Sequence, residues 1–122
     1  PCELSRGLNI TREPRELLDK VGNVVDSTKQ THKNSLCCGG SLGITNTSAE
    51  QKKTIAASTI NQITSSETDV VATACPLCKK TFSAAQDEIH VRDISEILVK
   101  NLYCNDTKIS VKEKMNNATV SV

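Results

Sequence analysis

The chain has 122 residues, a formal net charge of +1 and two aromatic side chains, Phe82 and Tyr103. This length suits one domain with one small hydrophobic core. Because the charge is nearly neutral and aromatic platforms for base stacking are scarce, we expect no nucleic-acid partner. No apolar run approaches the roughly 20 residues that cross a bilayer. We therefore expect a cytoplasmic protein that meets a membrane only indirectly, at the periphery of a complex.

The chain before Cys37 is predicted to hold two short helices, a brief strand and a polar loop, over residues 2–6, 14–20, 23–26 and 27–35. Pro14 suits the first turn of the second helix, and Gly7 and Gly22 are placed to end the two helices. The sequence begins at Pro1 without an initiator methionine. We therefore expect the chain to be a piece excised from a longer polypeptide.

The middle of the chain carries the clearest signals for a helix and a buried strand. Ser48 with Gln51 three residues later matches a capping box and starts a helix that extends to about residue 65. The apolar stripe of this helix consists of Ala56, Ile60 and Ile63. Residues 69–74 form a continuous apolar run of the kind buried in parallel sheets, and this run leads directly into Cys75-Pro76. The Cys75-Pro76-Leu77-Cys78 segment is therefore predicted where a strand turns into a helix.

The same alternation continues toward the end of the chain. A helix from Pro76 to about Gln86 is followed by a strand over 89–91 and by a last helix that Asp93 and Glu96 cap. The apolar face of the last helix is predicted to contain Ile94, Ile97, Leu98 and Leu102. The fold predicted from this order is a single α/β domain, with a small parallel sheet flanked by helices in Rossmann-like layers. We assign this domain to residues 1–104 and a loosely held polar tail to residues 105–122.

Five of the six cysteines form a C…CC…CxxC pattern. They are Cys2, Cys37, Cys38, Cys75 and Cys78. A helix start favours thiolates at the CxxC, and Gly39 and Gly40 allow backbone N–H groups to approach sulfur closely. Five thiolates would change the formal charge from +1 to −4, and a bound cationic centre would offset that charge. Because adjacent side chains diverge, the Cys37-Cys38 pair suits different irons of a cluster better than one tetrahedral zinc ion.

A family resemblance rests on these five cysteines and on four segments: Pro14 to Leu18, Cys37-Cys38-Gly39-Gly40, Asp69 to Cys78 and Val91 to Ile94. The sequence resembles the cysteine-rich CCG domain over residues 1 to about 103. This domain occurs in heterodisulfide reductase catalytic subunits and in the iron–sulfur subunits of glycolate, lactate and anaerobic glycerol-3-phosphate oxidoreductases. The glycine pattern here, Gly-Gly-Ser-Leu-Gly, departs from the commoner Gly-x-Gly-Gly form.

The resemblance implies an iron–sulfur protein of an oxidoreductase, active in electron transfer or in heterodisulfide- or quinone-linked redox chemistry. It implies a 4Fe–4S cluster, non-cubane in the heterodisulfide reductases, with the five matching cysteines as ligands, whereas some relatives hold zinc. The partners that it implies are other redox domains or subunits of the same complex, such as a ferredoxin-like domain and a flavoprotein.

Other functions are compatible with the same cysteines. A zinc-stabilised structural or interaction domain would use them without redox chemistry. A thiol–disulfide oxidoreductase would use Cys75 and Cys78, although no proline lies downstream to face them. A secreted disulfide framework suits shorter, loop-rich chains.

The remaining candidate residues are assigned ordinary roles. We expect His32 and His90 on the surface or beside the ligands, and Lys79 and Lys80 on a solvated helix face. Cys104 is predicted to complete the buried stripe of the last helix as a small hydrophobe.

Overall fold

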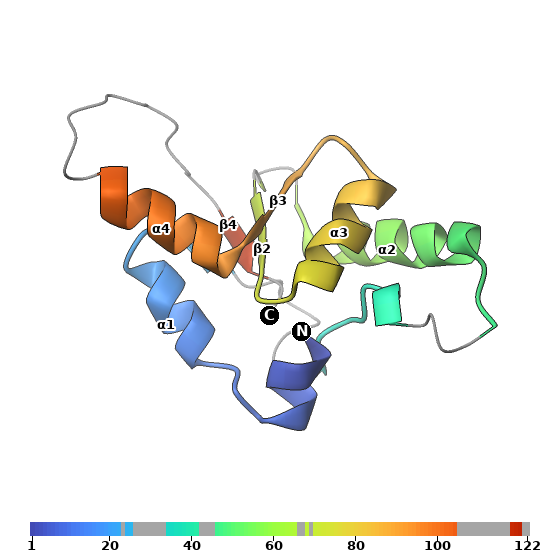
Figure 1. The fold of residues 1–122 in the computed structure, drawn as a ribbon, viewed down its shortest axis with the longest axis horizontal. Helices are drawn as coiled ribbons and strands as arrows, with labels where there is room; N and C mark the ends of the chain where they lie inside the picture. The colour runs from blue at the N-terminus through green and yellow to red at the C-terminus, as the bar shows by residue number, and fades with distance from the viewer. Residues whose placement is uncertain are drawn as a thin grey trace.

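The computed structural model describes residues 1–22, 24–25, 34–41, 46–65, 68, 70–104 and 118–120. Within these ranges helices and strands alternate along the chain (Figure 1). The elements are the π-helix η1 (Glu3–Gly7), α1 (Glu13–Asp19), β1 (Val24–Val25), α2 (Ala49–Ile63), β2 (Val70–Thr73), α3 (Pro76–Ala85), β3 (His90–Asp93), α4 (Ile94–Cys104) and β4 (Ala118–Val120). The predicted α/β class is confirmed.

The strands form one parallel sheet in the order β1-β4-β2-β3. Strand β2 pairs with β3 over its whole length, from Val70 opposite His90 to Thr73 opposite Asp93. On its other side β2 pairs with β4, which in turn pairs with β1. Because parallel neighbours need crossover connections, each helix that joins two strands covers a face of the sheet.

Strand β4 corrects the expectation of a loose polar tail. Ala118 to Val120 lie inside the sheet, between β1 and β2. Three small or β-branched residues give too short a local signal for a strand, and their partners lie far back along the chain. Pairing with two distant strands therefore decides their structure. The rest of the predicted tail, residues 105–117 and 121–122, lies outside the described residues.

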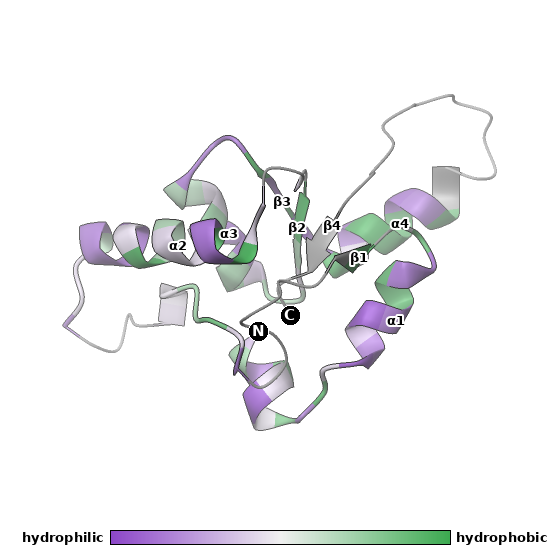
Figure 2. Cartoon of the chain, turned by 180° about the vertical axis from the view of Figure 1, so that it is seen from behind, coloured by the Kyte–Doolittle hydropathy of each residue, from purple (hydrophilic) through white to green (hydrophobic). Residues whose placement is uncertain are grey.

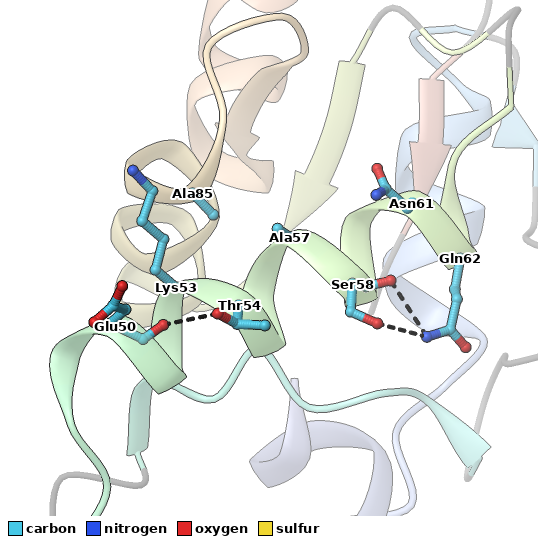
Figure 3. A pocket seen from close by; sticks show the side chains of 8 residues that line it. All are labelled: Glu50, Lys53, Thr54, Ala57, Ser58, Asn61, Gln62 and Ala85. Carbon is cyan, nitrogen blue, oxygen red and sulfur yellow. Dashed lines mark hydrogen bonds between the residues drawn. The ribbon is translucent and has the colours of Figure 1, made fainter.

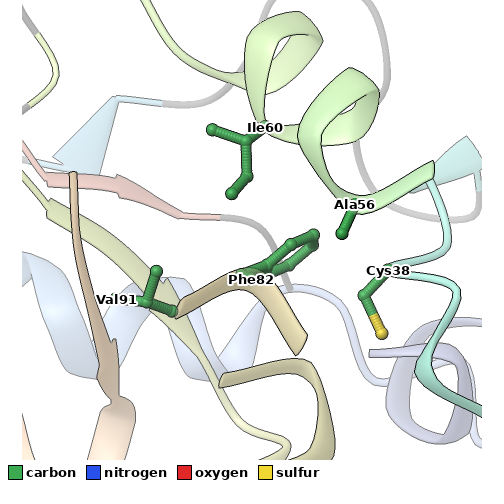
Figure 4. Close-up of a cluster of buried hydrophobic side chains, with 5 residues drawn as sticks. All are labelled: Cys38, Ala56, Ile60, Phe82 and Val91. Atoms are coloured by element: carbon green, nitrogen blue, oxygen red, sulfur yellow. The ribbon is translucent and has the colours of Figure 1, made fainter. Parts of the chain in front are cut away.

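Two apolar clusters occupy the two faces of the sheet. On one face, helices α1 and α4 enclose Leu18, Ala72, Ile94 and Ile97. On the other, α2 and α3 enclose Cys38, Ala56, Ile60, Phe82 and Val91 (Figure 4). Coloured by hydropathy, the helices show hydrophilic and hydrophobic residues in alternation along their length (Figure 2). This arrangement is the predicted layering of helices on both faces of a parallel sheet.

The helix starts follow the local signals in the sequence. Ser48 Oγ accepts from the N–H of Gln51, and Gln51 Oε1 accepts from the N–H of Ser48, so the predicted capping box is present. Asp93 likewise accepts from Ser95, while its own N–H donates to Glu96. The prediction for Leu102 was wrong, since 68% of it is exposed near the end of α4.

No helix among the described residues combines the length and the apolar character that crossing a bilayer requires.

Candidate metal centre

Cys75 and Cys78 lie where β2 ends and α3 begins. Cys75 has extended backbone angles and is the N-cap of α3, and Pro76 occupies the first turn. Cys78 follows one turn later. The sulfurs of Cys75 and Cys78 therefore both lie at the N-terminal end of α3, which is the positive end of the helix dipole. The predicted position of the CxxC at a strand-to-helix turn is confirmed. Ligand sites in open parallel sheets gather at this carboxyl end of the strands.

The other three cysteines reach the same region from two separate segments. Cys2 directly precedes η1, and Cys37 and Cys38 lie in the segment 34–41. Figure 1 shows η1 beside the carboxyl end of β2, near the start of α3. Cys38 belongs to the apolar cluster between α2 and α3, where Cys78 also packs. The three segments that carry the cysteines therefore meet at one end of the sheet.

The two glycines after the cysteine pair direct backbone N–H groups at sulfur, as predicted. Gly39 N donates to Cys37 Sγ and Gly40 N donates to Cys38 Sγ, both at 3.4 Å. Gly39 has a φ of +79°, a left-handed conformation that glycine adopts without a Cβ penalty. The two donors would stabilise negative charge on both sulfurs.

Helices α2 and α3 fix this segment from two sides. Thr59 of α2 donates to the carbonyl oxygen of Cys37 at 3.0 Å. On the side of α3, a Cβ at Gly40 would lie 2.5 Å from Thr81 Oγ1 and 3.0 Å from Leu77 Cγ. The absence of a side chain at Gly40 therefore lets the cysteine pair approach the CxxC helix closely.

The thiol of Cys38 interacts with that of Cys78. The hydrogen bond between them lowers the pKa of Cys38 to about 6, and donors from Gly40 and Thr81 act in the same direction against the effect of burial. The same hydrogen bond raises the pKa of Cys78, as do its burial and the negative charges of Cys38 and Cys75. Cys78 thus links the buried Cys38 to Cys75.

The thiol of Cys2 interacts with that of Cys37. Burial raises the pKa of Cys2, and the charge of Cys37 and a hydrogen bond with it add to this effect, while Arg6 opposes it. Neighbouring Cys37 and Cys38 therefore reach different partners, Cys2 on one side and Cys78 on the other. This divergence agrees with the argument from adjacent side chains.

All five sulfurs belong to free thiols. Cys38 is buried, Cys37, Cys75 and Cys78 are half-buried, and Cys2 is exposed. Within the described part of the chain, no three His, Cys, Asp or Glu side chains are arranged to hold a single metal ion. The cysteines are instead arranged as the pair Cys2–Cys37 and the group Cys38–Cys78–Cys75.

The other candidates have ordinary surroundings where the structure describes them. His90 is exposed on β3. Lys79 pairs with Glu96 at 2.5 Å and so joins α3 to α4, while Lys80 is exposed. His32 and the side chain of Cys104 lie outside the described residues.

A shallow hollow on the outer side of α2 contains no cysteine. It is lined by seven residues of α2 and by Ala85 of α3 (Figure 3). Its wall includes hydrogen bonds within α2, from Thr54 to the carbonyl of Glu50 and from Gln62 to Ser58. These groups already satisfy one another, and we assign the hollow no function.

Four hydroxyl residues around the cysteines were not found from the sequence: Ser5, Ser35, Thr59 and Thr81. Each contacts a group that lies far away in the chain or belongs to the backbone, as when Ser5 Oγ lies 3.1 Å from Ser35 Oγ. Serine and threonine are common in this sequence, so residue type alone does not single these four out.

A comparison with known proteins shows that the part of the chain with these five cysteines matches a known family. The family model described as a cysteine-rich CCG domain matches residues 1–83. One relative is a subunit of the dihydromethanophenazine:CoB–CoM heterodisulfide reductase of Methanosarcina barkeri, which is 26% identical over 110 residues. That match covers 84% of this chain and 26% of the relative.

Other relatives have related names. A subunit of the fumarate reductase (CoM/CoB) of Methanothermobacter marburgensis is 24% identical, over 84% of this chain and 20% of that protein. An uncharacterized iron-sulfur protein of Methanocaldococcus jannaschii is 29% identical, over 76% of this chain and 16% of that protein. The chain thus spans about a quarter or less of the length of these curated relatives. No solved structure matches the chain significantly.

Proposed function

Since the chain belongs to the cysteine-rich CCG domain family, we propose that it holds an iron–sulfur cluster and passes electrons within an oxidoreductase. The ligands are Cys2, Cys37, Cys38, Cys75 and Cys78. The observation that carries the proposal is the divergence of the adjacent pair, because Cys37 interacts with Cys2 while Cys38 interacts with Cys78. A cluster several ångströms across can bind two adjacent cysteine side chains that point in different directions, whereas one tetrahedral ion does not readily do so.

The surroundings of the sulfurs fit such a group. Thiolates are the ligands that iron–sulfur clusters take, and the N–H groups of Gly39 and Gly40 already point at two of these sulfurs. When bound, the cluster would accept and release single electrons. The two N–H donors would then stabilise the added negative charge and raise the reduction potential. The burial of Cys38 would keep water away from one side of the centre.

A zinc-stabilised domain is the second candidate. The observation in its favour is the CxxC spacing of Cys75 and Cys78, which is common among structural zinc ligands, together with the hydrogen bond between Cys78 and Cys38. This function needs no electron transfer. It leaves the contact between Cys2 and Cys37 without a use.

The proposed redox role includes partners. Two of the relatives are named as subunits of reductases, and this chain covers about a quarter of one and a fifth of the other. We propose that the domain works beside other redox domains or subunits, such as a ferredoxin-like domain or a flavoprotein. Heterodisulfide- or quinone-linked chemistry would then belong to the whole assembly.

The test is a metal analysis of protein prepared and reconstituted without oxygen. The proposal predicts iron and acid-labile sulfide in equal amounts, with visible absorbance that bleaches on reduction. The same preparation is assayed for zinc. Zinc at one equivalent, with no iron and no visible absorbance after reconstitution, would overturn the proposal in favour of the second candidate.

A further inference from the structure

A buried pair of serine hydroxyls joins η1 to the segment that carries the adjacent cysteines. Ser5 of η1 is 1% exposed and Ser35 is 5% exposed. Their Oγ atoms lie 3.1 Å apart. Leu4 adds an apolar contact from the same helix to the cluster under α1 and α4. These residues attach the element that carries Cys2 to the rest of the molecule.

The hydrogen bonds run in one direction through this pair. Ser5 Oγ donates its single proton to the carbonyl oxygen of Pro1 at 2.9 Å. Ser35 must therefore be the donor to Ser5. The peptide carbonyl of Pro1 belongs to the bond that joins Pro1 to Cys2, and Ser35 lies two residues before Cys37. The chain of hydrogen bonds thus connects the backbone next to Cys2 to the segment that carries Cys37.

Arg6 adds a contact between the same two elements. Its guanidinium donates to the carbonyl oxygen of Ser35. Together with the pair Ser5–Ser35, this contact opposes both sliding and rotation of η1 against the segment 34–41. An apolar contact such as that of Leu4 is less directional, because burial of apolar area does not fix an angle or a register.

Burial makes the serine pair selective for one arrangement. A buried hydroxyl without a partner costs about 1–3 kcal/mol, so any shift of η1 that separates Ser5 from Ser35 is penalised. A single buried polar contact can fix register in this way, as a buried asparagine does in coiled coils. Cys2 is the most exposed of the five cysteines and has the least packing of its own to hold it in place.

We propose that Ser5 and Ser35 are positioning residues that hold Cys2 beside Cys37 and thereby make it the fifth ligand of the centre. The inference rests on the proposed function. Without the pair, Cys2 leaves the centre and four cysteines remain. Four thiolates are the ordinary ligand number of a cubane cluster, so the variant keeps iron but carries a centre of a different type. A purely structural role would lower stability without changing the type of centre.

The first experiment compares spectra of the full chain after anaerobic reconstitution. The double variant Ser5→Ala/Ser35→Ala is compared with Cys2→Ser, with the wild type and with Ser83→Ala, which removes an exposed hydroxyl from α3. We expect the electron paramagnetic resonance and visible spectra of the double variant to match those of Cys2→Ser. Ser83→Ala is expected to match the wild type. Wild-type spectra from the folded double variant would overturn the inference.

The second experiment works without metal and so does not depend on the identity of the cofactor. In reduced protein that keeps only Cys2 and Cys37, with the other cysteines changed to alanine, the bifunctional thiol reagent dibromobimane joins the two thiols. Loss of the serine pair is expected to slow this cross-linking at least about tenfold, since small displacements reduce intramolecular rates steeply. Single Ser5→Ala and Ser35→Ala variants serve if the double variant does not fold. An unchanged rate would overturn the inference, whereas absence of iron in the wild type would overturn only the proposed function.

Discussion

The contact between Gly40 and α3 determines how closely the cysteine pair approaches the CxxC helix. Thr81 and Leu77 of α3 lie so close to Gly40 that a Cβ at this position would collide with them. The N–H of Gly40 is also the donor to Cys38. Gly40 thus both allows the close approach of the cysteine pair to α3 and stabilises negative charge on the sulfur of Cys38.

Gly40→Ala is therefore expected to destabilise the protein by about 1–3 kcal/mol, the usual cost of overpacking a filled site. The matched control is Gly22→Ala, because nothing lies within 4 Å of a Cβ at Gly22. Urea unfolding followed by circular dichroism measures both free energies. Equal stability of the two variants would show that the close approach at Gly40 is not a constraint.

Residues that act over long sequence distances were the ones that sequence reasoning missed. The roles of Gly39 and Gly40 were predicted correctly, because each donates to a sulfur two residues away. Ser5 and Ser35 are 30 residues apart, and nothing in either local sequence indicates the contact. Such pairs become visible only once the fold has brought their elements together.

At the scale of elements, α3 is tied to α4 by the ion pair of Lys79 with Glu96. Glu96 also accepts from the N–H of Asp93 and so helps to begin α4. These two contacts lower the pKa of the Glu96 carboxyl, with the hydrogen bond to Lys79 as the larger cause. Lys79 is the residue after Cys78, so this pair orients the first turns of the helix that carries two of the proposed ligands.

The lowered pKa of Glu96 predicts a pH dependence. A carboxyl whose pKa is lower in the folded protein stabilises it above the unfolded value, near 4.5, and this contribution is lost as the pH falls through the folded value. Glu96→Gln should therefore lower the urea midpoint at pH 7 and have less effect near pH 3. Glu50→Gln, in the first turn of α2, is the control. The same difference at both pH values would contradict this account.

Helix starts were the elements that the sequence predicted best. Ser48, Asp93 and Pro76 act through neighbours within one turn, so their signals survive in a single sequence. The end of α4 was predicted less well, because apolar spacing alone does not show where the packed surface beneath a helix ends, and 68% of Leu102 is exposed.

At the scale of the whole molecule, strand β4 completes the sheet. β1 pairs with β4 and not with β2, so β4 joins β1 to the other strands. The sequence predicted the alternation of helices and strands and the class of fold, because each inner element has its own hydrophobic pattern. It could not predict that a three-residue strand near the end of the chain enters between two others.

Truncation after Cys104 should therefore disrupt the sheet. We expect the 1–104 variant to lose its cooperative urea transition or to unfold at a clearly lower urea concentration than the full chain. Circular dichroism and intrinsic Tyr103 fluorescence follow the transition. An unchanged urea midpoint would show that residues 105–122 are dispensable, as the sequence alone had indicated.

The central claim is that five cysteines at one end of the sheet hold one iron–sulfur centre and that the sixth does not take part. The most direct measurement is the iron content of anaerobically reconstituted Cys38→Ala and Cys104→Ala, determined in parallel with the wild type. Cys38→Ala is predicted to lose the centre or to convert it to one with less iron. Cys104→Ala is predicted to keep the wild-type iron content and visible spectrum. Equal loss of iron in the two variants would contradict the ligand set.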